Sequence, residues 1–151
     1  DPNPAYSENL IGYLMGRAHF QFLSGLRKPM AAYGMTDADF YVLSLLSIQQ
    51  PQSPAEIASH MAYTGTDIGT VALQSLISKG WVEESRGRAE SLQLTAQGNT
   101  AILHVLAAAK AVETDLIESL GEMEAATLRN LLKKAITATD PGLPKLWQAK
   151  A

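Results

Sequence analysis

The sequence predicts a mainly α-helical fold with one small β-hairpin, and two patterns carry this prediction. Apolar residues recur every three or four positions over most of the 151 residues, which indicates amphipathic helices. The period changes to two only between residues 81 and 94, where two short apolar segments flank a glycine-centred tip. A chain of this length can bury a core of its own without disulfide or metal support.

Helical patterns fill the chain before the hairpin. Ser7 and Gly34 fit the start and the stop of a first helix whose apolar positions repeat every four residues. A later segment has Ser53 as an N-cap, Pro54 at the first helical position and Glu56 three residues after the cap, which is a strong start signature. The segments expected to be helical are 7–35, 36–48, 54–61 and 66–79.

The period of two predicts an antiparallel hairpin over 81–84 and 91–94, joined by a tip centred on Gly87. Three helices followed by such a hairpin have the layout of a winged helix-turn-helix lobe, which we place at 36–94. In this layout the helix before the hairpin enters the major groove of DNA. The hairpin, or wing, lies beside that helix.

The polar residues of this lobe predict a DNA-binding set. The outer face of the helix at 66–79 carries Gln74, which can make a bidentate contact with adenine, and threonines, which can hydrogen-bond a base or touch a thymine methyl. Arginines at the wing tip suit phosphates or a minor groove. The alternative is that the same residues form an ordinary solvated helix face. The predicted DNA-binding residues are Ser53, Thr64, Thr66, Thr70, Gln74, Arg86 and Arg88.

Two further helices are expected after the hairpin, at 95–120 and 122–138, separated by Gly121. The first would be about 39 Å long at 1.5 Å per residue, too long for one small lobe to cover. Its apolar stripe and that of the first helix therefore need a partner, and isologous pairing of two identical chains is the commonest solution. We assign 7–35 and 95–138 to a helical dimerisation region and 139–151 to a tail.

Short motifs along most of the chain carry a resemblance to a known family. They are the segments 26–36, 40–43, 53–58, 80–82, 94–98 and 120–124. In their order and spacing they resemble the MarR family of bacterial transcriptional regulators, over about residues 8 to 138. The resemblance implies a homodimer whose first, fifth and sixth helices intertwine, and whose two winged lobes bind a palindromic site on double-stranded DNA. It also implies a repressor that a small, often aromatic, ligand releases from DNA.

Candidate residues for that ligand come from the helices of the dimerisation region and from the lobe. We expect His19, Phe20, Phe22, Tyr41 and His104 to line a pocket between the two parts. The three histidines of the chain have no nearby carboxylate pair, so no metal site is expected, and no cofactor is expected either. The sequence has no Gly-x-Ser-x-Gly element or comparable context, which argues against an enzyme.

Composition excludes several other classes. The chain has no cysteine, which excludes disulfides, thiolate zinc sites, cysteine nucleophiles and thiol-based redox sensing. No apolar run approaches the roughly 20 residues that span a bilayer, and the first residues do not have the pattern of a secretion signal. We expect a cytoplasmic protein with no membrane partner.

The charge of the lobe opposes the DNA-binding prediction. Residues 36–98 contain three basic and seven acidic side chains, so the balance there is −4 in a chain of net charge −3. The chain also departs from the family pattern here, with Val71 and Glu84 where the family usually has basic residues, and Arg86 where it usually has an aspartate that braces the wing arginine. Two hypotheses stay open: a ligand-responsive DNA-binding repressor, and a winged-helix dimer with weak or lost DNA binding that acts through protein or small-ligand contacts.

Overall fold

A computed structural model describes residues 10–139 and 142. Its elements, in chain order, are α2 (Ile11–Tyr33), α3 (Asp37–Ile48), α4 (Pro54–Met61), the 3-10 helix η1 (Ala62–Thr64), α5 (Thr70–Ser78), β1 (Val82–Glu84), β2 (Leu92–Leu94), α6 (Ala96–Leu120) and α7 (Glu122–Thr139). The predicted mainly helical fold with one hairpin is confirmed. The predicted cap Ser7 lies outside the described residues, as does the predicted tail apart from residues 139 and 142.

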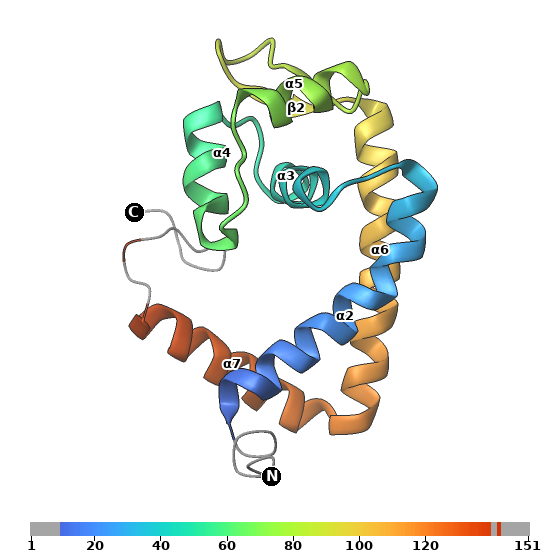
Figure 1. Cartoon of the computed structure of the whole chain (residues 1–151), viewed down its shortest axis with the longest axis vertical. Coiled ribbons are helices and arrows are strands. Elements are labelled where there is room, and N and C mark those ends of the chain that lie inside the picture. The colour runs from blue at the N-terminus through green and yellow to red at the C-terminus, as the bar shows by residue number, and fades with distance from the viewer. Residues whose placement is uncertain (1–9, 140–141, 143–151) are drawn as a thin grey trace, which may run out of the picture.

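The elements form two groups that share α6 (Figure 1). At one end α3 is surrounded by α4, α5, the hairpin and the first half of α6 (Figure 1). At the other end lie α7, the second half of α6 and the beginning of α2 (Figure 1). Helices α2 and α6 pack closely where they meet, because a Cβ on Gly25 would come within 2.5 Å of the Val112 side chain.

Local capping explains where several helices begin and end. At the start of α3 the Thr36 side chain accepts a hydrogen bond from Asp39 N (3.1 Å), and the Asp39 carboxylate accepts one from Thr36 N (3.0 Å). Ser53 and Glu56 form the same reciprocal pair at the start of α4, as predicted. Gly34 ends α2 in the left-handed conformation, with φ of 64°, which a residue without a Cβ adopts at no steric cost.

The core of the lobe surrounds α3. Its side chains Val42, Leu43 and Leu46 are fully buried, and α4, α5, β1 and α6 each bring at least one fully or almost fully buried aliphatic residue against them. The hairpin pairs in an antiparallel register with Val82 opposite Leu94 and Glu84 opposite Leu92. The core thus fixes one face of α5 and one face of the hairpin and leaves the other faces to solvent.

The helix before the hairpin begins four residues later than the sequence predicts. Residues 66–79 were expected to be helical, but α5 starts at Thr70 with Gly69 as its N-cap. Gly65 takes a left-handed conformation with φ of 67°, and the Thr64 hydroxyl accepts a hydrogen bond from Thr66 N (3.0 Å), so the chain turns here instead of starting a helix. Thr66 therefore lies in the segment before the helix, and its predicted place on the helix face is wrong.

Candidate nucleic-acid interface

An open groove of about 1030 Å³ lies between α4, α5 and the hairpin. Three residues of the predicted DNA-binding set line it, namely Ser53, Thr70 and Gln74. Most of the remaining lining is apolar, and Glu84 and Glu90 line it from the hairpin side. The fold thus brings the first turn of α4, the exposed face of α5 and the hairpin onto one surface.

The exposed face of α5 carries no charge. Leu73 and Leu76 are buried, whereas the residues at the complementary helical positions are exposed. These exposed residues are Thr70, Val71, Gln74, Ile77 and Ser78. Thr70 and Gln74 therefore occupy the face on which the sequence placed them. The 85% exposure of Val71 identifies a further member of this face, which was not among the predicted DNA-binding residues.

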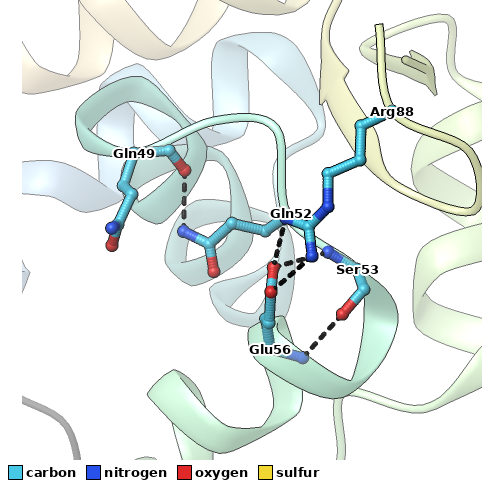
Figure 2. Close-up of polar contacts among 5 residues, drawn as sticks. All are labelled: Gln49, Gln52, Ser53, Glu56 and Arg88. Atoms are coloured by element: carbon cyan, nitrogen blue, oxygen red, sulfur yellow. Dashed lines mark hydrogen bonds and ion pairs between the residues drawn. The ribbon is translucent and has the colours of Figure 1, made fainter. Parts of the chain in front are cut away.

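The wing is joined to α4 by an ion pair that was not predicted. Arg88 Nη1 donates to Glu56 Oε2 (3.0 Å) and Nη2 donates to Oε1 (2.6 Å), so the pair is bidentate (Figure 2). The same Glu56 Oε2 accepts the hydrogen bond from Ser53 N (3.0 Å). The hydrogen bond with Glu56, and then its negative charge, raise the pKa of the Arg88 guanidinium above its ordinary value. The wing arginine is therefore braced by a carboxylate from α4 and not by one within the wing.

The loop before α4 is also attached to the hairpin. Gln52 and Leu92 exchange two backbone hydrogen bonds, of 3.0 and 2.7 Å. The Gln52 side chain, which is buried, donates to Gln49 O (2.7 Å; Figure 2), and the Gln50 side chain accepts from Leu94 N (2.8 Å). These contacts and the Arg88–Glu56 pair fix the start of α4 against the hairpin from two directions.

The remaining predicted residues differ in how free their side chains are. Thr64 Oγ1 donates to Met61 O (2.7 Å) and accepts from Thr66 N, so this hydroxyl already stabilises the turn before α5. Ser53 Oγ accepts from Glu56 N (3.2 Å). Arg86 is exposed and makes no ion pair within the described part of the chain.

Lys79, at the end of α5, is held by contacts with other residues of the protein. Its Nζ lies 2.6 Å from Asp39 Oδ2 and 5.2 Å from the centre of the Trp81 ring. Because Asp39 is only 3% exposed and also caps α3, this contact ties the end of α5 to the start of α3. The charge of Lys79 is therefore used to position α5.

The five residues predicted to bind a ligand make separate contacts. His19 and Phe20 are exposed on α2 with their rings 5.9 Å apart, while Phe22 and Tyr41 pack against the core. His104 Nδ1 is hydrogen-bonded to the Tyr33 hydroxyl. None of the five lines the groove described above, nor the smaller cleft of about 340 Å³ between the starts of α3 and α5. Within residues 10–139 and 142, no three His, Asp or Glu side chains are placed to hold a metal ion.

Solved structures of known proteins share this architecture. A MarR-family transcriptional regulator from Silicibacter pomeroyi superposes with a TM-score of 0.75 at 20% identity, over 92% of this chain and 96% of that one. The transcriptional repressor CouR bound to a 23-mer DNA duplex gives 0.70 at 23% identity, over 89% and 98%. CouR from Rhodococcus jostii bound to p-coumaroyl-CoA gives 0.70 at 18% identity, over 95% and 100%.

Comparison of the sequence alone gives no such match: no family model and no curated protein matches this chain. The structural likeness extends over almost the whole length of both chains in each comparison. It includes the helices at both ends of the chain as well as the winged lobe. The chain therefore has the fold of the MarR-family transcriptional regulators, which is the fold that its motifs predicted.

Proposed function

We propose that this protein is a DNA-binding transcriptional regulator that reads a palindromic operator as a homodimer. The observation that carries the proposal is the exposed, uncharged face of α5, with Thr70 and Gln74 on the same groove as the first turn of α4 and the hairpin. A helix in this position in a winged lobe meets base edges, and the adjoining loops meet the backbone. The complex of CouR with duplex DNA supports the proposal, because CouR has the same fold.

The dimer is proposed from apolar side chains that one chain leaves uncovered. On α2, Ile11 is 70% and Phe20 65% exposed, and on α7, Met123 is 85% and Leu131 57% exposed. Helix α7 and the beginning of α2 lie at the end of the molecule away from the hairpin (Figure 1). Apolar surfaces of this extent mark a contact with another molecule. A second copy is the occupant we propose, because an isologous contact covers the same faces on both chains.

Sedimentation equilibrium tests this assembly directly. The protein should sediment as a dimer, and Leu131→Glu should shift the equilibrium towards a folded monomer, because it places a charge in the proposed contact. Ser59→Glu, at an exposed position of α4 in the lobe, is the control with the same added charge. A monomeric native protein at micromolar concentration would contradict the dimer.

DNA binding is tested by selecting duplexes from a random pool and titrating the selected sequence over a range of salt. Gln74→Ala should relax the base preference at one position of each half-site, because its amide can make a bidentate contact with adenine. Arg86→Ala should weaken binding to all sequences about equally, because a phosphate contact carries no sequence information. The reverse pattern would mean that α5 does not lie in the groove.

We further propose that a small aromatic ligand controls this regulator, as a repressor released from its operator. The support is that CouR, with the same fold, has been solved with p-coumaroyl-CoA. The proposed pocket is the one expected from His19, Phe20, Phe22, Tyr41 and His104. Titration of the protein–DNA complex with p-coumaroyl-CoA and with p-aminosalicylic acid, followed by fluorescence anisotropy, tests for release.

A second function is favoured by the charges around the groove. Lys79 and Arg88 are paired within the protein, whereas Glu84 and Glu90 line the groove. A lobe with these charges would suit a protein or small-ligand partner in place of DNA. If the selection recovers no preferred duplex even at low salt, this second function replaces the first.

A further inference from the structure

We infer that α5 selects A·T base pairs and that Val71 does so by contacting a thymine methyl group; the inference rests on the proposed function. Its starting point is the exposure of Val71, which at 85% is equalled, among the large apolar residues that the structure describes, only by Met123. Val71 is the second residue of α5 and lies at the end of the helix that borders the segment 65–69. An aliphatic side chain left this exposed on the proposed DNA-contacting face needs a chemically matching surface.

The face lacks the side chains that most often read guanine. The commonest specific contact to guanine is a bidentate one from arginine or lysine to O6 and N7. The segment Thr70–Ser78 contains neither residue, and the lysine that follows it, Lys79, is held by Asp39 at 2.6 Å. The described fold therefore offers no cation on α5 to read a G·C pair.

The groups that are present suit adenine and thymine. Gln74 can donate and accept in a bidentate contact with N6 and N7 of adenine. The γ-methyl groups of Val71 and Thr70 can pack on the C5-methyl of thymine, which G·C pairs lack. Residues 71 and 74 lie three apart, and residues 70 and 74 lie four apart, so the Gln74 side chain neighbours both Thr70 and Val71 on the helix. Such a set is placed to read adjacent base pairs.

The other exposed residues of the face are consistent with this chemistry. Ile77 is 39% exposed and adds a second aliphatic group, and Ser78 adds a hydroxyl. The helix itself contains no carboxylate, and Asp67 belongs to the segment before it. The helix thus reads its site mainly by methyl contacts and by one amide.

Replacement of thymine by deoxyuridine in the selected duplex tests the inference, because it removes only the C5-methyl and keeps the base pairing. The affinity of the native protein should fall about fourfold for each contacted methyl, since burial of one such group is worth roughly 0.8 kcal/mol. Val71→Ala should bind the thymine and deoxyuridine duplexes with nearly equal affinity. Ser78→Ala, at the far end of the same face, should keep the full dependence on thymine and serves as the control.

The outcomes separate the inference from the function on which it rests. A selected site with a G·C core, or equal affinity of the native protein for the thymine and deoxyuridine duplexes, overturns the inference and leaves the DNA-binding function standing. Loss of the thymine dependence in Ser78→Ala but not in Val71→Ala also overturns it. Failure to select any duplex overturns both.

Discussion

Replacement of Asp39 by alanine tests how the position of α5 is held. In the native protein the Asp39 carboxylate accepts hydrogen bonds from Thr36 N at 3.0 Å and from Lys79 Nζ at 2.6 Å. It is 3% exposed, so water does not replace these partners in the folded state. Asp39→Ala removes half of the cap of α3 and releases the end of α5 at the same time.

The expected loss of stability follows from these two contacts. A helix cap contributes about 1 kcal/mol, and a hydrogen bond to a charged group contributes roughly 1.5 to 3 kcal/mol. The free energy of unfolding should therefore fall by about 2.5 to 4 kcal/mol. At roughly 2 to 4 °C per kcal/mol for a chain of this size, the Tm should fall by about 5 to 15 °C.

Asp37→Ala is the matched control, because it removes the same charge from the first turn of the same helix but from an exposed side chain. It should cost only the favourable interaction with the helix dipole, about 0.3 to 1 kcal/mol. Urea denaturation at one fixed protein concentration measures both variants. If Asp39→Ala loses no more stability than Asp37→Ala, the Lys79 contact does not hold α5, and the reasoning fails.

Three further predictions concern packing, the wing and salt. Gly98→Ala should abolish stable folding, because the added Cβ would lie 2.9 Å from Trp81 Cα and closer still to the Trp81 carbonyl. The cooperative thermal transition should then be lost. Gly16→Ala is the control and should fold normally, because its added Cβ would meet no atom within 4 Å. Glu56→Gln should speed amide hydrogen exchange at residues 85–90, because it removes the charge that holds Arg88, whereas Glu84→Gln should not. A plot of the logarithm of the DNA association constant against the logarithm of the salt concentration should have a slope of about −2 per dimer, because only Arg86 in each lobe is free to neutralise a phosphate. A slope steeper than about −5 would mean that the paired cations also contact phosphates.

The sequence predicted best those features that depend on neighbours within one helical turn. The cap at Ser53 and the stop at Gly34 lie where the pattern placed them, because each is made by residues at most four positions apart. The predicted start of α5 was wrong for a related reason. Ile68 continues the apolar period of the helix and is buried, but it is buried from the segment before the helix, which Gly65 and Gly69 keep out of the helical conformation.

The contacts that shape the candidate interface could not be predicted from local pattern. Arg88 and Glu56 are 32 residues apart in sequence, and Lys79 and Asp39 are 40 apart. Glu56 and Asp39 each also take part in a helix cap, and the sequence predicted that local role for Glu56. The second role appears only when the core brings the hairpin against α4 and the end of α5 against α3.

These pairs change what the acidity of the lobe means for DNA binding. Binding to DNA without regard to sequence depends on cations that neutralise phosphates. Two of the three cations between residues 36 and 98 are paired with carboxylates, and the exposed face of α5 carries none. Such a lobe should bind nonspecific DNA weakly, while methyl and amide contacts on its own site are unaffected by the shortage of cations. Because occupancy of an operator depends on the ratio of specific to nonspecific affinity, a lobe poor in free cations can still select its site effectively.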